Sequence, residues 1–108
     1  MQGDAQLNRI KEIIETHRGK ENQISAGEIG LQIGIREDAT HVQVRSLIRQ
    51  AIERLILPIA ASSRGYYLIK DKHELDEYLT NIDGRIAEMR TRKTLVEEAF
   101  EIYYRKTK

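Results

Sequence analysis

Residues 38–69, DATHVQVRSLIRQAIERLILPIAASSRGYYLI, decide the fold. Apolar side chains recur at helical spacing up to about Ile56, which predicts a helix with one buried stripe. The expected stripe is Val44, Leu47, Ile48, Ala51, Ile52 and Leu55. Pro58 forbids further helix, and two short β-prone runs follow it at residues 59–61 and 66–69. Residues 62–65 (SSRG) between the runs place glycine where a turn needs positive φ, so the pattern predicts a β-hairpin.

Two shorter helical patterns precede this stretch. The first spans residues 4–17 and has apolar residues at steps of three and four, Leu7, Ile10, Ile13 and Ile14. Residues 18–22 break the pattern and supply Gly19 at a C-terminal cap. Residues 23–25 are long enough only for a stub of strand. Ser25 and Glu28 have the spacing of a capping box, which predicts a second helix through Ile33 that Gly34 ends.

The order of these elements is that of a winged helix-turn-helix. Helix, short strand, helix, turn, helix and hairpin follow within about 70 residues, and few other folds of that size need this order. We therefore expect a mainly α fold with a small β-hairpin (α+β). Residues 1–70 would form the winged helix-turn-helix domain, and residues 71–108 one long C-terminal helix. Tyr66 and Tyr67 alternate on a strand, so one is expected in the core and the other on the surface.

The long helix carries a seven-residue repeat. Its apolar positions alternate steps of four and three over about four heptads, as in a coiled coil. They are Leu79, Ile86, Lys93 and Phe100 at position a, and Leu75, Ile82, Met89, Val96 and Tyr103 at position d. The stripe predicts a homodimer or a higher homo-oligomer. In the alternative, residues up to about Met89 fold back on the first helix as extra core.

The charges along the repeat leave the direction of pairing open. Lys93 at position a is a polar interruption that weakens two-stranded packing. In a parallel pair, Arg92 would meet Glu97 of the second copy, but Arg85 would meet Arg90. Parallel, antiparallel and bundle arrangements all remain open at this point.

The composition excludes several classes of function. The chain has 108 residues with 18 basic and 17 acidic side chains, a net charge of +1, which excludes a histone-like coat on DNA. A hydrophobic content of 40% suffices for a core and excludes an acidic disordered tail. The lack of cysteine excludes a disulfide scaffold and a thiolate zinc site. With no apolar run near 20 residues, we expect no membrane span, no signal peptide and a cytoplasmic location.

Enzymatic chemistry is not expected. His17, His41 and His73 lie on separate elements, and no pair has metal-ligand spacing on one helix face. Gly30 and Gly34 flank a helix rather than form a phosphate-binding loop. We therefore expect no catalytic residues, no metal, no cofactor and no small-molecule ligand.

Parts of the chain resemble a family of small phage and prophage winged-helix proteins. The segments that carry the resemblance are residues 44–48 (VRSLI), 58–69 (PIAASSRGYYLI) and 74–79 (ELDEYL), with Arg85. The similarity covers about Ile24 to Arg92, and the Gly-Tyr-Tyr wing is its most specific part. It implies DNA binding in phage regulation or replication. The family usually has glycine two residues before the proline, where this chain has Ile56, which predicts a different end to the third helix and a tilted wing.

A winged helix places its third helix in the major groove and its wing along the backbone or minor groove. The outward face of the expected helix offers Gln43 to read adenine and Arg49 to fork onto guanine or clamp a phosphate. Arg64 at the wing tip is expected to contact a phosphate or to enter a narrow minor groove. Further contacts to the DNA backbone are expected from Arg36, Thr40, His41, Arg45, Ser46, Ser62 and Ser63.

These side chains also have ordinary surface interpretations. Gln43 is alternatively a plain surface residue, and Arg45 is alternatively paired with Glu53 or with an acid on another helix. Glu37, Asp38 and Glu53 oppose binding because they add negative charge beside the expected face.

The expected function is sequence-specific binding of double-stranded DNA by an oligomeric regulator of the phage type. Residues 1–70 carry 10 basic and 8 acidic side chains, a net charge of +2, which predicts modest non-specific affinity and a shallow dependence on salt. The alternative is a winged-helix module for protein interaction or assembly that does not bind DNA, and the near-neutral charge favours it.

Overall fold

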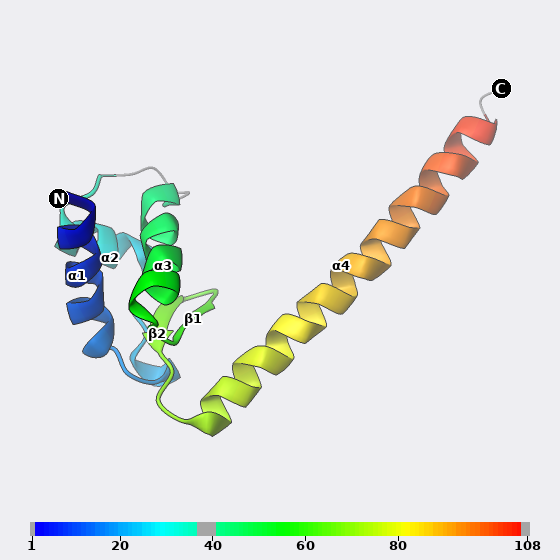
Figure 1. Cartoon of the computed structure of the whole chain (residues 1–108). Coiled ribbons are helices and arrows are strands. Elements are labelled where there is room, and N and C mark those ends of the chain that lie inside the picture. The colour runs from blue at the N-terminus through cyan, green and yellow to red at the C-terminus, as the bar shows by residue number, and fades with distance from the viewer. Residues whose placement is uncertain (1, 37–40, 107–108) are drawn as a thin grey trace. The chain divides into compact units, whose positions relative to one another are not determined.

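Three helices and a hairpin follow one another in the expected order (Figure 1). The helices α1 (Gln2–Glu15), α2 (Ala26–Ile33) and α3 (Val42–Leu55) precede the strands β1 (Ile59–Ser62) and β2 (Gly65–Leu68), and α4 (Lys72–Lys106) comes last. The computed structural model describes residues 2–36 and 41–106. The chain divides into an N-terminal unit, Met1–Glu74, and a C-terminal unit, Leu75–Lys108. The mainly helical fold with one small antiparallel hairpin and a long C-terminal helix is confirmed.

Both ends of α2 have the expected caps. The hydroxyl of Ser25 accepts a hydrogen bond from the backbone N–H of Glu28 at 3.1 Å. Gly34 ends the helix in the left-handed conformation, with φ of 78°. Between α1 and α2 the chain makes a 3₁₀ turn, Lys20–Asn22, which Gly19 enters with φ of 90°.

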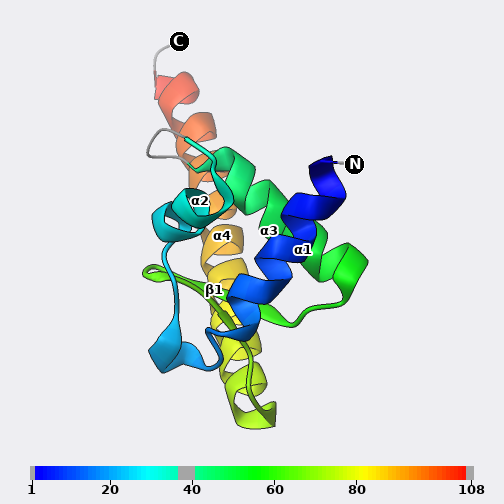
Figure 2. The same ribbon diagram turned by 90° about the vertical axis from the view of Figure 1, so that its left-hand side faces the viewer.

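The core of the N-terminal unit lies between α1, α2, α3 and the hairpin. Figure 2 shows α1 crossing in front of α3, and the apolar stripe of α1 is fully buried. The core side chains are Leu7, Ile10, Ile13, Ile14, Ile24, Ile29, Val44, Leu47, Ile48, Ala51, Leu57, Ile59 and Leu68. The expectation for Ile52 is wrong, because its side chain is 41% exposed. It lies at the edge of the α3 stripe, whose centre is set by Val44 and Ala51.

β2 is hydrogen-bonded on both edges. β1 pairs with it antiparallel, with Ile59 opposite Leu68. On the other edge, Ile24 and Tyr66 exchange two backbone hydrogen bonds of 2.8 Å, which confirms the stub of strand expected at residues 23–25. Tyr67 is buried, but Tyr66 is half-buried and packs against the core, so the expectation that one of the two lies on the surface is wrong.

α3 ends at a residue with an unfavourable backbone. Ile56 adopts the left-handed conformation, with φ of 55°, and its N–H donates to the carbonyl of Ala51. For an L-residue this conformation costs roughly 1–2 kcal/mol relative to glycine. The resemblance places glycine at this position, so Ile56 ends the helix with a conformation typical of glycine. Its side chain is 79% exposed.

A buried carboxylate ties the first turn of α4 to the N-terminal unit. Glu74 is 7% exposed, and its two oxygens accept the backbone N–H groups of Lys20 at 2.9 Å and Lys70 at 3.0 Å. The N–H of Glu74 donates to Asp71, the cap of α4. Beside it, Glu21 hydrogen-bonds the ammonium of Lys70 and raises the pKa of that lysine. The N-terminal unit therefore extends to Glu74, four residues beyond the expected boundary at residue 70.

Candidate nucleic-acid interface

The turn of the hairpin is held by Ser62. Its hydroxyl accepts the backbone N–H of Arg64 at 3.1 Å and donates to the side-chain oxygen of Gln23. The turn residues Ser63 and Arg64 are exposed. Ser62 therefore shapes the turn, and Ser63 and Arg64 are the side chains that it presents to solvent.

The hairpin turn, the start of α2 and the start of α3 line one hollow, called the hairpin hollow below. Its lining residues are Ser25, Ala26, Gly27, His41, Ala61, Ser62, Ser63, Arg64, Gly65 and Tyr66. Four of the residues expected to contact DNA are among them: His41, Ser62, Ser63 and Arg64. His41 is the N-cap of α3, so the hollow joins the beginning of that helix to the turn of the hairpin.

Arg36 lies at an adjoining hollow. That hollow is lined by Gly27, Gly30, Leu31, Ile35, Arg36 and His41. Gly27 and His41 line both hollows, so Arg36 and Arg64 belong to adjoining parts of the surface. Thr40, Glu37 and Asp38 lie outside the described residues.

The exposed surface of α3 has two rows of polar side chains. Gln43, Ser46 and Gln50 are spaced by three and four residues and line a third hollow with Gln6 of α1. In that row Gln50 donates to the hydroxyl of Ser46 at 3.2 Å. Arg45 and Arg49, one turn apart, form the second row, and both are exposed. The expected readers Gln43 and Arg49 therefore belong to different rows of one helix.

An ion pair reduces the free charge of α3. The guanidinium of Arg49 donates to the carboxylate of Glu53 at 2.9 Å, four residues further on. The alternative pairing of Arg45 with Glu53 is wrong, because Glu53 pairs with Arg49 and Arg45 is eight positions away, more than two turns of the helix. Arg45 makes no ion pair with any residue in ranges 2–36 and 41–106.

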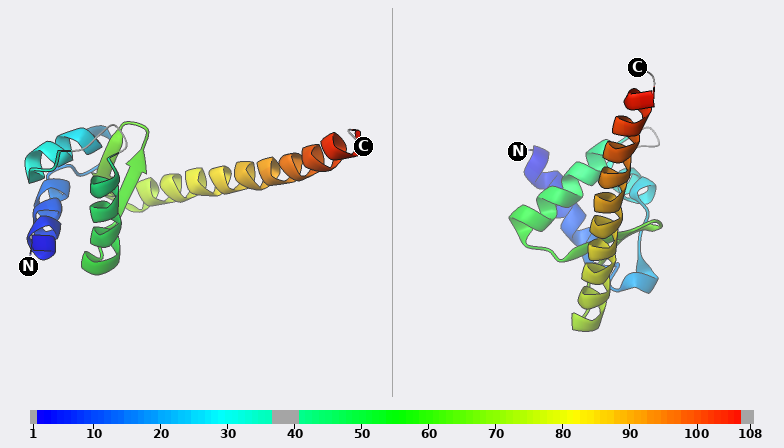
Figure 3. Two further views of the ribbon diagram at one scale, coloured as in Figure 1. Left: turned by 90° about the horizontal axis from the view of Figure 1, so that it is seen from above. Right: turned by 90° about the vertical axis from the view of Figure 1, so that its right-hand side faces the viewer.

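The hairpin turn and α3 can be followed together in two views. In Figures 1 and 3 the turn end of the hairpin projects beside α3, on the side away from α1. The hairpin hollow carries a guanidinium, hydroxyl groups and the N-terminus of α2, all of which suit a phosphate. Within the described residues no cluster of three His, Asp or Glu side chains could hold a metal ion.

The start of α2 is the part of this surface that sequence reasoning missed. Ser25 was assigned only to the cap of a helix and Gly27 was given no role, yet both line the hollow beside Arg64. The capping box was a usable signal, because it marks a helix N-terminus whose first N–H groups lack partners within the helix. The pairing of Ile24 with Tyr66, distant in sequence, brings that terminus to the hairpin.

The heptad positions of α4 are largely exposed. Leu79, Ile86, Met89, Lys93, Val96, Phe100 and Tyr103 are exposed, and Leu75 and Ile82 are half-buried. Leu95 and Ile102 at position c and Tyr104 at position e are exposed as well, so the exposed apolar side chains near the C-terminus are not confined to the seam. Sequence reasoning missed these three because they do not follow the repeat.

Comparisons with protein-family models, with curated proteins and with solved structures found no match. Among the helices of the described residues, none combines the length and the apolar character needed to cross a membrane.

Proposed function

We propose that this chain is a winged helix-turn-helix protein that binds double-stranded DNA. It would act as a homo-oligomer held by α4, in transcriptional or replication control of the phage type and in the cytoplasm. The observation that carries the proposal is the hairpin hollow, where the turn of the hairpin and the first residue before α3 meet. A groove-binding helix and a wing must lie on one surface if both are to touch one duplex.

Each part of this surface has a proposed contact. α3 would enter the major groove, with Arg45 and Arg49 on phosphates or guanine and Gln43 on adenine. Arg64 and Ser63 would contact the backbone beside the groove, and the N-terminus of α2 would approach a phosphate. Ser62 would act through the shape of the turn, since its hydroxyl already bonds Arg64 and Gln23.

The charge balance supports an oligomer on the DNA. Glu53 neutralises part of the charge of Arg49, and residues 1–70 have a net charge of only +2. One copy would therefore release few counterions and bind non-specific DNA weakly. Two linked copies double the phosphate contacts and make the second binding event intramolecular.

A second candidate is a protein-interaction module. The observation that favours it is the set of exposed apolar side chains on or next to α3, namely Val42, Ile52 and Ile56. Exposed apolar side chains, of which Ile52 and Ile56 are one helical turn apart, suit a protein surface better than phosphates.

A titration of duplex DNA at two salt concentrations tests the proposal. The protein should shift a labelled duplex and bind more weakly as salt rises. Combining Arg49→Ala with Arg64→Ala should reduce affinity by about tenfold or more at the lower salt, because two phosphate or base contacts are lost. Glu53→Gln should raise the affinity for DNA, because it removes the carboxylate that pairs with Arg49.

Arg9→Ala is the matched control. Arg9 lies on α1 and pairs with Glu12 at 3.0 Å, so its loss also leaves an unpaired glutamate on a helix surface. Arg9→Ala should lower the affinity for DNA less than Arg49→Ala does, although the two variants have the same net charge. Equal effects of the two single changes, or no binding to any duplex at low salt, would reject the proposed face and favour the protein-interaction module.

A further inference from the structure

The second half of α4 consists of two blocks of opposite charge. Residues 85–93 have four basic side chains and one acidic, a net charge of +3. Residues 94–104 have three acidic side chains and none that is basic, a net charge of −3. The blocks are adjacent on one helix, and each is about nine to eleven residues long.

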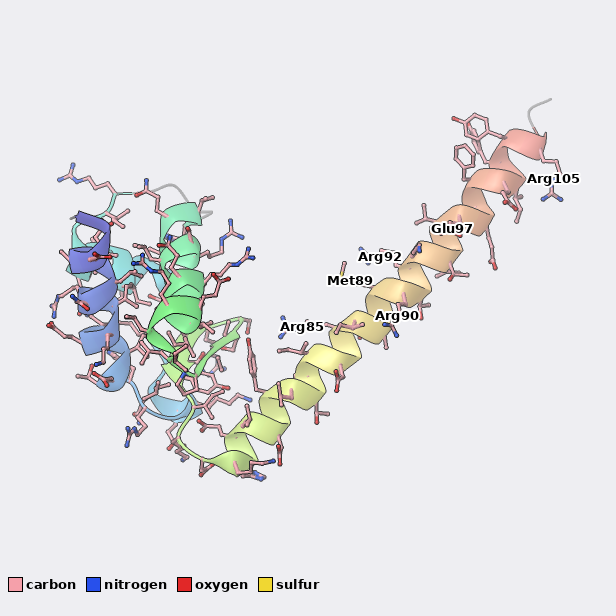
Figure 4. The ribbon with its side chains drawn as sticks, viewed as in Figure 1. Arg85, Met89, Arg90, Arg92, Glu97 and Arg105 are labelled. Carbon is pink, nitrogen blue, oxygen red and sulfur yellow. The ribbon has the colours of Figure 1, made fainter. Side chains whose placement is uncertain are left out.

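The charged side chains of these two blocks form no ion pairs with one another. The eight side chains concerned are Arg85, Glu88, Arg90, Arg92, Lys93, Glu97, Glu98 and Glu101. None of them makes an ion pair with another described residue. Figure 4 shows Arg85, Met89 and Arg92 projecting from one side of α4 and Arg90 from the other. Basic groups therefore flank Met89, a position d residue that is 73% exposed.

We propose that residues 85–104 of α4 pair antiparallel with the same segment of a second copy of this chain. This inference rests on the proposed self-association and adds its direction and register. In an antiparallel pair the basic block of each copy faces the acidic block of the other. The two helix dipoles also run in opposite directions, so the positive end of each helix lies towards the negative end of the other.

A single register satisfies the apolar positions of residues 86–103 and pairs Arg90 with Glu97. In an antiparallel coiled coil each position a side chain faces a position d side chain of the other helix. Placing Met89 opposite Phe100 of the second copy also places Ile86 opposite Tyr103. In the same register Lys93 falls opposite Val96 rather than opposite another lysine.

The flanking positions next to the centre of the pair agree with this register, whereas Arg85 meets Lys106 of the second copy at each end. Arg90 and Glu97 both occupy position e, and in the antiparallel pair each Arg90 meets Glu97 of the second copy. Arg92 falls opposite Ala99, whose small side chain leaves room for the arginine stem. That stem can cover Leu95, an exposed apolar residue beside Ala99 on the helix surface.

The parallel arrangement is disfavoured by the same residues. It sets the basic block against the basic block and the acidic block against the acidic block. Arg92 would gain Glu97, but Arg85 would face Arg90 and the two Lys93 side chains would meet inside the seam. Like charges held at these positions destabilise a pair and select against it.

Disulfide trapping in the full-length chain tests whether the helices pair antiparallel. Because the chain has no cysteine, each introduced thiol is the only one in its chain. Met89→Cys and Phe100→Cys chains are mixed under reducing conditions and then oxidised. We expect a mixed disulfide that joins position 89 of one chain to position 100 of the other. Little disulfide should join two copies of position 89, since they would lie about 16 Å apart along the axis. A dominant disulfide between two copies of position 89 would overturn the antiparallel pair and leave DNA binding as a dimer intact.

A spin-label distance gives a second measurement that leaves the seam unchanged. Thr80 is exposed, and Thr80→Cys carries the label. In the proposed register two labels would be separated by about 44 Å of helix length, whereas a parallel pair holds them within roughly 10–15 Å.

Light scattering on the same sample should give the mass of two chains. A single-chain mass at micromolar concentration would overturn self-association itself, and the duplex titration would then judge DNA binding separately.

Discussion

Gly65→Ala is expected to unfold the hairpin and most of the N-terminal unit with it. A Cβ atom at this position would lie 2.2 Å from the carbonyl oxygen of Ile24 and 2.6 Å from its carbonyl carbon. These atoms belong to backbone that is hydrogen-bonded to Tyr66, so they cannot move without breaking that pairing. Gly65 also has φ of 151°, a conformation that residues with a Cβ rarely adopt.

The expected loss is about 3–5 kcal/mol of the free energy of unfolding, the range of severe backbone and packing defects. A urea titration of the full-length chain, followed by the fluorescence of the tyrosines, measures it. Gly34→Ala is the control, because Gly34 also has positive φ but no atom lies within 4 Å of the added Cβ. It should cost only about 1 kcal/mol. Similar losses for both variants would contradict the proposed collision with Ile24.

Combining Met89→Glu with Phe100→Glu is expected to leave a monomer that binds DNA at least about a hundredfold more weakly. Both side chains are exposed seam positions, at 73% and 63%. The introduced glutamates repel each other in either direction of pairing. In an antiparallel pair residue 89 meets residue 100 of the second copy, and in a parallel pair each residue meets its own counterpart. Loss of the second copy removes the intramolecular second contact, which is worth factors of about 10² to 10⁴. Light scattering and a duplex titration measure the two effects.

The control places the same charges on the outer side of the helix. Ala87→Glu with Thr94→Glu lies at heptad position b and changes the net charge equally. This variant should remain a dimer and keep nearly all its affinity. The melting temperature of the N-terminal unit should be the same in both variants. A monomer that binds DNA as well as the parent chain would contradict the role given to α4.

The local parts of the fold could be predicted from the sequence because short-range chemistry decides them. Ser25 caps α2, Gly34 ends it, and Gly65 follows the hairpin turn, each as its residue type favours. Ile52 was predicted wrongly because its spacing fits the apolar stripe while the packing of α1 against α3 leaves its side exposed.

The long-range parts could not be predicted. Glu74 has the pattern of a first-turn helix residue, and only the folded chain shows its carboxylate bonded to Lys20 and Lys70. The hairpin hollow likewise depends on contacts between segments about 40 residues apart. The ion pair of Arg49 with Glu53, by contrast, has the four-residue spacing of a helical pair and was available from the sequence.

Backbone amide shifts in a nuclear magnetic resonance titration test the central claim most directly. A short duplex is added to the isotope-labelled chain. The proposed face predicts that the largest shifts fall at His41 to Arg49, at residues 25–27 and at residues 62–65, while the outward residues of α1, such as Arg9 and Lys11, stay unchanged. Shifts centred on α1, or spread along α4 with none in the hairpin turn, would contradict a duplex-binding surface made by α3 and the hairpin.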